Sequence, residues 1–267
     1  ARGMAISQKM QAQVRGLRQA SRNSLDGISL IQTAEGALNE VHAMLQRMRE
    51  LCVQGANGVY AEDDLKAIGE ELVQLTEQID KIANETEFNG IPLLKGDLRS
   101  KEEVELGGSG GTSGATTSGI TKLQLQVGAN ENQTIIIDMK DINVKVSELK
   151  IDGNNTSGKK IEFIEKTSGK SGSFNLKTSG LTQENFGKAI SIYQSAIDTV
   201  ASQRSKLGAY QNRIEHTIKN IDNTAENLTA SMSRIEEFTR LNILQQAGTA
   251  MLAQANQLPQ SVLQLLR

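Results

Sequence analysis

Apolar side chains recur every seven residues through much of the C-terminal third of the sequence. The repeat comprises Leu207, Ile214, Ile221, Leu228 and Ile235, and further apolar residues follow three of them after four positions. A sustained seven-residue apolar repeat makes helices supercoil around one another, because only a supercoil keeps the repeat facing its partner. The pattern therefore predicts a helical arm over residues 181–235 that packs against other helices as in a coiled coil.

The N-terminal third offers the partner helices. Two runs of apolar residues there alternate spacings of three and four, which is the pattern of a heptad seam. The first run is Ile31, Ala34, Leu38, Val41, Leu45, Met48 and Cys52, and the second is Leu65, Ile68, Leu72, Leu75, Ile79 and Ile82. Glycines and acidic residues at positions 55–64 predict a turn between two helices. Residues 1–96 are therefore expected to form a helical hairpin, which closes where Asn89-Gly90 and Pro92 stop helix propagation.

Large rings contribute little to the core that this sequence can build. Aromatic residues make up 3% of the 267 residues, and tryptophan is absent. Because aromatic rings supply much of the buried area in ordinary globular cores, this chain must bury aliphatic side chains along helix seams instead. The predicted fold class is mainly α: a long coiled-coil-like helical bundle built from both terminal arms, with a small β-rich insertion between them.

The middle of the chain, residues 97–180, has a different character. The segment GGSGGTSGATTSG at 107–119 has the composition of a linker. Three short runs are typical of strands, namely KLQLQVG at 122–128, TIIID at 134–138 and KKIEFIEK at 159–166. We expect a small, exposed, β-rich excursion rather than a catalytic domain.

The C-terminal segment, residues 236–267, is amphipathic and almost without charge from position 241 up to Arg267. A free-standing helix of this composition would expose an apolar stripe and need a partner. The segment is therefore a candidate for self-assembly or for binding to a chaperone, and the alternative is a disordered tail.

The sequence contains no recognisable catalytic, metal-binding or phosphate-binding motif. The net charge of −2 gives no electrostatic footprint for nucleic acid, and no apolar run is long enough for membrane insertion. His42 and His216 stand on predicted helices without the spacing of a metal site, and glycines at 107–114 follow no predicted strand that could make a phosphate-binding loop. No catalytic, metal or cofactor-binding residues are predicted, and an enzyme is not expected.

Several long stretches resemble bacterial flagellin. In the N-terminal arm these are ASRNSLDGISLIQTAEGALNEVHAMLQRMREL (20–51) and FNGIPLLKG (88–96). In the C-terminal arm they are LGAYQNRIEHTI (207–218), NLTASMSRI (227–235) and AGTAMLAQANQLPQSVLQLLR (247–267). The resemblance covers most of both arms, whereas the middle of the chain matches nothing specific.

The resemblance implies a structural subunit of the flagellar filament, exported through the flagellar apparatus and therefore extracellular. Its implied partners are other flagellin subunits, an export chaperone and the flagellin-sensing Toll-like receptor of animals. Two departures from the family pattern lead us to expect a truncated form. The sequence starts inside the family's first arm, and SRIEEFTRLNIL (233–244) lacks a short acidic, methionine-containing segment. A non-polymerising receptor agonist and an adhesin or glycan-binding module in the variable region are the alternatives.

The resemblance also assigns roles to individual residues. Arg47, Leu51 and Glu71 match the receptor-binding motif, and Arg47 and Leu51, one helical turn apart, could share an exposed face. The alternative is that Arg47 pairs with acids of the neighbouring helix while Leu51 packs. In the C-terminal segment, the anchors for assembly or chaperone binding would be Leu244, Met251, Leu252, Leu258, Leu263 and Leu266.

Cys52 continues the first seam, and a free cysteine commonly behaves as a small buried apolar residue. A packing role is therefore favoured over a reactive thiol, while Arg47 and Arg49, which lie off the seam, are expected to face outward. The full set expected to pack in the coiled coil is Leu38, Val41, Leu45, Met48, Cys52, Leu207, Ile214, Ile221 and Leu228.

Overall fold

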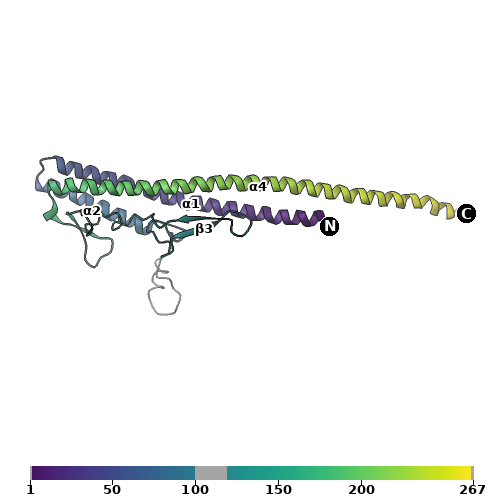
Figure 1. Cartoon of the computed structure of the whole chain (residues 1–267), viewed down its shortest axis with the longest axis horizontal. Coiled ribbons are helices and arrows are strands. Elements are labelled where there is room, and N and C mark those ends of the chain that lie inside the picture. Colours follow the sequence, from purple (N-terminus) through teal and green to yellow (C-terminus); the bar gives the residue numbers. More distant parts are fainter. Residues whose placement is uncertain (1, 100–118, 266–267) are drawn as a thin grey trace, which may run out of the picture. The chain divides into compact units, whose positions relative to one another are not determined.

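The fold was analysed in a computed structural model that describes residues 2–99 and 119–265, with side chains described up to residue 255. Helices dominate it (Figure 1), which confirms the predicted mainly α class with a small content of strand. In chain order the elements are α1 (Arg2–Asn57), α2 (Glu62–Glu85), β1 (Glu87–Phe88), β2 (Ile91–Pro92), β3 (Lys122–Gln126), β4 (Thr134–Asp138), β5 (Ile164–Lys166), β6 (Phe174–Leu176), the 3-10 turn η1 (Thr178–Gly180) and α4 (Gln183–Leu265).

The described chain divides into two compact units, and helices α1 and α4 contribute to both. Unit 1 consists of residues 2–25, 126–134 and 215–265, and unit 2 consists of residues 26–99, 119–125 and 135–214. Helix α4 continues without interruption through residues 235 and 236, where the sequence suggested a division between the C-terminal arm and the last segment. The four segment boundaries drawn from the sequence stay a prediction.

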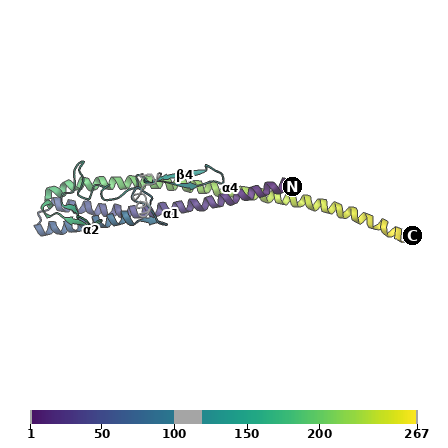
Figure 2. The ribbon, with the colours of Figure 1, turned by 90° about the horizontal axis from the view of Figure 1, so that it is seen from below.

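Three helices form the core of unit 2, where parts of α1 and α4 lie alongside α2 (Figures 1 and 2). The whole first seam of α1, from Ile31 to Cys52, is fully buried. The seam of α2 departs from the expected one after Leu72, because Thr76, Ile79 and Ala83 are buried while Leu75 and Ile82 are only half-buried. Burial of Thr76 is inexpensive because its hydroxyl donates to the carbonyl of Leu72 at 2.7 Å.

The hairpin turn between α1 and α2 lies within the predicted stretch. Helix α1 ends at Asn57 and α2 begins at Glu62, with three acidic residues in its first turn that complement the positive end of the helix dipole. After α2, strands β1 and β2 pair in an antiparallel hairpin closed by Asn89 (φ 51°) and Gly90 (φ 79°). Asparagine and glycine tolerate this left-handed conformation, which two-residue hairpin loops require.

The prediction of an exposed excursion is wrong for the described part of the middle segment. This part buries a series of aliphatic and aromatic side chains, among them Ile137, Met139, Ile142, Val144 and Phe163. It contains three hairpin-forming strands at or near the predicted runs, and a further strand, β6, that the sequence did not suggest. Each sheet in the described parts of the chain has two strands. An isolated two-stranded sheet is marginally stable in water, so these sheets require packing on the helices.

Specific contacts fix this segment on the helices of unit 2. The Tyr210 hydroxyl accepts a hydrogen bond from the backbone of Asp138 at 3.1 Å, and Gln203 Nε2 donates to the carbonyl of Asn143 at 3.0 Å. On α2, Glu77 accepts from the backbone of Phe174 at 3.0 Å. The described part of the middle segment therefore belongs to the folded core of unit 2 and is not an appendage.

In unit 1, a small apolar cluster joins the start of α1 to the second half of α4. Leu17, Ala20 and Ile221 are buried together, and Leu228 packs against them half-buried. Two side-chain hydrogen bonds accompany this cluster, from Ser21 to Asp222 at 3.1 Å and from Ser7 to Glu236 at 3.0 Å. The seven-residue repeat thus supplies buried residues in both units, with Leu207 and Ile214 fully buried in unit 2.

Candidate functional site

Cys52 is the last residue of the buried α1 seam, and it influences the ionisation of Tyr193 on α4. Its side chain is fully buried, and burial raises the pKa of the thiol to about 12. Burial, with a further contribution from Cys52, also raises the pKa of the Tyr193 phenol well above its ordinary value. A thiol that stays protonated at neutral pH is a poor nucleophile, so this position can pack but offers little chemistry.

Two buried polar groups in this region have no hydrogen-bond partner among the described residues. These are the Tyr193 hydroxyl and Arg49 Nε. The expectation that Arg49 faces outward is therefore only partly right, because its side chain is half-buried. The aliphatic stem of an arginine readily covers apolar surface, which explains why a residue off the seam is not fully solvated.

Arg47 and Glu71 form an ion pair between α1 and α2. Arg47 Nε lies 3.1 Å from Glu71 Oε1, Nη2 lies 3.4 Å from Oε2, and Nη1 lies 3.8 Å from Glu50 on the next helical turn. The Arg47 and Glu71 side chains are 50% and 42% exposed. An exposed pair of this kind contributes little to stability, about 0–1 kcal/mol, but it presents a planar donor and a carboxylate at the surface.

The expectation that Leu51 shares the exposed face of Arg47 is wrong. The Leu51 residue is only 2% exposed. Helix α1 is flanked by both α2 and α4, so it buries a second stripe of residues besides its main seam. Gly55, one turn further on, is buried as well, and a Cβ there would lie 2.8 Å from the Phe186 ring of α4. The structure therefore brings Arg47 and Glu71 together and places Leu51 beneath the surface.

The second half of α4 carries apolar side chains that nothing in the described structure covers. Leu244, Met251 and Leu252 are 57%, 72% and 68% exposed. Leu258 and Leu263 lie on the same helix, in the part whose side chains are not described, and Leu266 lies outside the described residues. The sequence reasoning missed Phe238, Leu241 and Ile243, which are equally exposed; the three-residue spacing of Leu241 and Leu244 could have indicated them.

Within the described residues, no group of three or more histidine, cysteine or acidic side chains is arranged to hold a metal ion. His42 contacts Gln46 at 3.0 Å on the surface of α1, and His216 is exposed on α4. None of the helices in the described parts of the chain combines the length and the apolar character that crossing a membrane requires.

Comparison with known proteins agrees with this arrangement. The bacterial flagellin N-terminal helical region matches residues 1–98, and the bacterial flagellin C-terminal helical region matches residues 190–266. The flagellin of Bacillus subtilis is 44% identical over 279 residues, covering 100% of this chain and 86% of that protein. Flagellin FlaB2 of Treponema pallidum is 38% identical over 276 residues, covering 100% and 85%.

Solved structures show the same fold. The crystal structure of Bacillus cereus flagellin covers 79% of this chain and 94% of its own, with 25% identity and a TM-score of 0.52. A putative flagellar hook-associated protein from Vibrio parahaemolyticus covers 85% and 95%, with 12% identity and a TM-score of 0.61, which shows similarity of fold alone. Because both terminal regions match the family and full-length relatives align over the whole chain, this protein belongs to the bacterial flagellin family.

Proposed function

We propose that this chain is a structural, non-enzymatic subunit of the bacterial flagellar filament and assembles through its helices. The observation that carries the proposal is the uncovered apolar row of α4, defined here as Phe238, Leu241, Leu244, Met251 and Leu252, each more than half exposed. Burying the exposed part of one such side chain contributes about 1 kcal/mol. The row as a whole therefore favours association strongly in a member of the flagellin family.

Seeded assembly tests this proposal. The purified chain is mixed with filament seeds, sedimented, and the pellet is inspected by electron microscopy. Leu244→Glu places a charge within the row and should abolish pelleting. The control variant Gln246→Glu adds the same charge outside the row and should pellet like the parent chain. Equal pelleting of the two variants would contradict a role for the row, and a parent chain that stays monomeric with seeds would support the alternative of a non-polymerising form.

We further propose that the same row, with the more C-terminal leucines, is held by an export chaperone before the subunit leaves the cell. An apolar stripe of this kind needs a partner in the cytoplasm as well as in the filament. Purified chaperone should protect a Leu244→Cys variant from maleimide labelling. Unchanged labelling in the presence of chaperone would exclude the row as its binding site.

Recognition by the flagellin-sensing Toll-like receptor is a second proposal, based on the exposed Arg47–Glu71 pair. A planar guanidinium at a protein surface is a common anchor in interfaces. Arg47→Ala should reduce receptor-reporter signalling at least tenfold, whereas Arg15→Ala, an exposed arginine elsewhere on α1, should leave it unchanged. Leu51 would then act by supporting the surface from below, so Leu51→Ala should reduce helix stability together with signalling.

An adhesin or glycan-binding role of the middle segment is the alternative from another class. It requires specific binding of sugars by the intact chain. The packing of this segment on α2 and α4 supports a structural role instead.

A further inference from the structure

Asparagine followed by glycine occurs twice in the sequence, and both pairs stand at turns of unit 2. Asn57 is the last residue of α1 and precedes Gly58, whereas Asn89 and Gly90 form the loop between β1 and β2. Such a pair can react with itself, because glycine has no side chain to hinder the approach of its own backbone nitrogen to the asparagine side chain. The two pairs share this chemistry and differ in structure, so each serves as the reference for the other.

The reaction is deamidation through a cyclic imide. The glycine nitrogen forms a bond to Cγ of the asparagine and loses its proton, while the bond from Cγ to Nδ2 breaks and the amide leaves as ammonia. Water then adds to one of the ring carbonyls: opening at Cγ gives aspartate, and opening at the backbone carbonyl gives isoaspartate, whose main chain runs through the former side chain. Water is the only other reactant. Because the peptide unit is planar, the ring closes only where the ψ angle of the asparagine is free to change.

The β1–β2 hairpin holds Asn89 against this change. Asn89 and Gly90 have φ angles of 51° and 79°, the left-handed conformation that two-residue hairpin loops require. Phe88 pairs with Ile91 directly beside the loop, and Leu93 after β2 is buried. A rotation about ψ of Asn89 would break this pairing, so the folded chain protects this asparagine although the residue is exposed.

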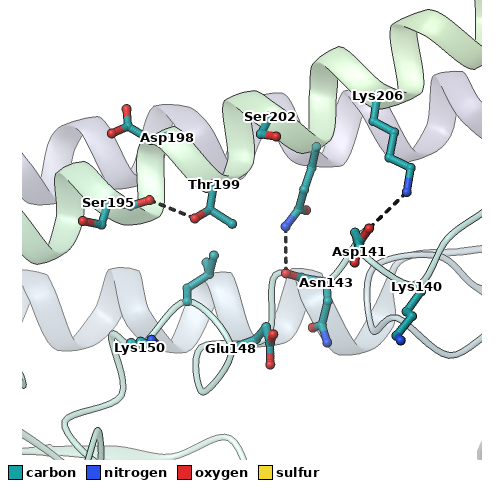
Figure 3. A pocket seen from close by; sticks show the side chains of 12 residues that line it. Lys140, Asp141, Asn143, Glu148, Lys150, Ser195, Asp198, Thr199, Ser202 and Lys206 are labelled. Carbon is teal, nitrogen blue, oxygen red and sulfur yellow. Dashed lines mark hydrogen bonds and ion pairs between the residues drawn. The ribbon is translucent and has the colours of Figure 1, made fainter. Parts of the chain in front are cut away.

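Asn143 is held in a different way. It lies in the polar groove between α4 and residues 140–150, where Gln203 donates to its carbonyl at 3.0 Å (Figure 3). Its Oδ1 accepts a hydrogen bond from the backbone of Lys145 at 3.2 Å, which is a local turn that asparagine side chains commonly form. The next residue is the β-branched Val144, so the attacking nitrogen is hindered as well. Asn143 therefore gives a second protected reference.

Asn57 stands at an exposed helix end instead. Residues 58–61, which follow it, belong to neither α1 nor α2. The last turn of a helix has carbonyls without intrahelical partners and frays readily, so ψ of Asn57 can change without breaking a sheet or an internal turn of the helix. The structure thus leaves free at Asn57 the rotation that it blocks at Asn89.

Gly58 is kept as glycine by its surroundings. A Cβ added at this position would overlap the ring of Tyr60, so a larger residue, which would shield Asn57, does not fit the turn. The carbonyl of Gly58 accepts a hydrogen bond from Gln183 Nε2, which ties the turn to the first residue of α4. This contact engages the oxygen, whereas the reaction uses the nitrogen of the same residue. The reactive pair is therefore built into the fold.

We propose that Asn57 is a modification site, at which the folded chain deamidates spontaneously while Asn89 and Asn143 stay intact. The product adds a carboxylate at the C-terminal end of α1, where the helix dipole is already negative, close in sequence to the three acidic residues that open α2. Isoaspartate also lengthens the main chain and moves the Gly58 carbonyl relative to Gln183. Deamidation should therefore weaken the α1–α2 turn.

Mass spectrometry after incubation of the native chain at mildly alkaline pH tests the proposal. Cleavage after lysine and arginine places the three asparagines in separate peptides, residues 50–66, 82–95 and 141–145. Deamidation should appear in the first peptide at least about tenfold faster than in the other two, because a helix end opens locally at a lower free energy than a packed hairpin. A sample digested without incubation corrects for reaction during digestion. In urea, Asn57 and Asn89 should react at similar rates, because the shared Asn-Gly pair then decides.

Asn57→Gln is the matched variant, since glutamine at this exposed position keeps the amide but closes such a ring far more slowly. After the same incubation, the parent chain should unfold at a lower urea concentration than before, whereas Asn57→Gln should keep its midpoint. An equal fall of the midpoint in both chains would contradict the weakening of the turn. Native Asn57 that stays intact while it reacts in urea would overturn the proposal, and equal rates at Asn57 and Asn89 in the native chain would overturn the assignment of Asn57 as the site that the fold selects.

Discussion

Two glycines of α1 should respond to the same substitution with opposite changes in stability. Gly36 is exposed, and a Cβ added there would meet nothing within 4 Å. Gly55 is buried, and a Cβ there would lie 2.8 Å from both Cδ2 and Cγ of Phe186. The Phe186 ring in turn packs on Phe163 with ring centroids 4.8 Å apart, so it has little freedom to move away.

The magnitudes follow from helix propensity and packing. Alanine is favoured over glycine in a helix interior by about 0.8–1.0 kcal/mol, so Gly36→Ala should raise the free energy of unfolding by about 1 kcal/mol. At Gly55 the gain is smaller, because the residue lies in the last turn of α1. Overpacking a filled core costs about 1–3 kcal/mol, so Gly55→Ala should lower the free energy of unfolding by roughly 1–2 kcal/mol.

Urea unfolding of the monomer, followed by circular dichroism at the helix band, measures both values. Both glycines lie in unit 2, so the midpoint of one transition can be compared across the parent and the two variants. The expected order of midpoints is Gly36→Ala, then parent, then Gly55→Ala, with similar slopes. If Gly55→Ala raised the midpoint as much as Gly36→Ala, the close approach of α1 to Phe186 would be refuted.

Three further predictions concern buried or partly buried polar groups. Tyr193→Phe removes a buried hydroxyl that has no hydrogen-bond partner among the described residues and should raise the free energy of unfolding by about 1 kcal/mol, measured by the same urea titration. Cys52, whose pKa burial raises to about 12, should react with a thiol reagent at pH 8 only after urea is added; rapid reaction of the native chain would contradict its burial. Burial also raises the pKa of the Asp80 carboxyl, against the attraction of Lys166, so its ionisation disfavours the folded state. The protonated carboxyl stabilises the fold below the ordinary pKa of aspartate, and this stability is lost as the pH rises through the raised pKa. The melting temperature should therefore decline over that pH range, and Asp80→Asn should make the decline smaller. An unchanged pH profile of the melting temperature would exclude Asp80 as the source of the decline.

The helices could be predicted because their periodicity follows directly from helix geometry. A residue every seven positions, as at Leu207 and Ile214, stays on one side of a supercoiled helix whatever its partner is, and both are fully buried. The helices against which a seam packs are harder to predict, since one apolar seam indicates one neighbouring helix and does not reveal further neighbours. Leu51 and Gly55 are buried because α1 has a second neighbour, and no pattern in α1 alone states how many neighbours it will have.

Polar residues and short strands escaped prediction for a different reason. Thr76 is buried on α2 because it satisfies its hydroxyl locally, which a pattern of apolar residues does not register. The middle segment reads as linker and isolated strands, yet its backbone forms specific hydrogen bonds with Tyr210, Gln203 and Glu77. Those partners lie roughly 60 to 100 positions away in sequence, so local composition gave no indication of them.

Along α4, the apolar residues pass from complete burial to wide exposure. Leu207 and Ile214 are 0% exposed and Ile221 is 4% exposed, whereas Leu244 and Met251 are 57% and 72% exposed. Folding of the chain therefore uses the first part of the helix, and the later residues gain no stability from the described fold. The apolar side chains of α4 thus continue beyond the described helices that could cover them, and apolar surface of this kind needs a further partner.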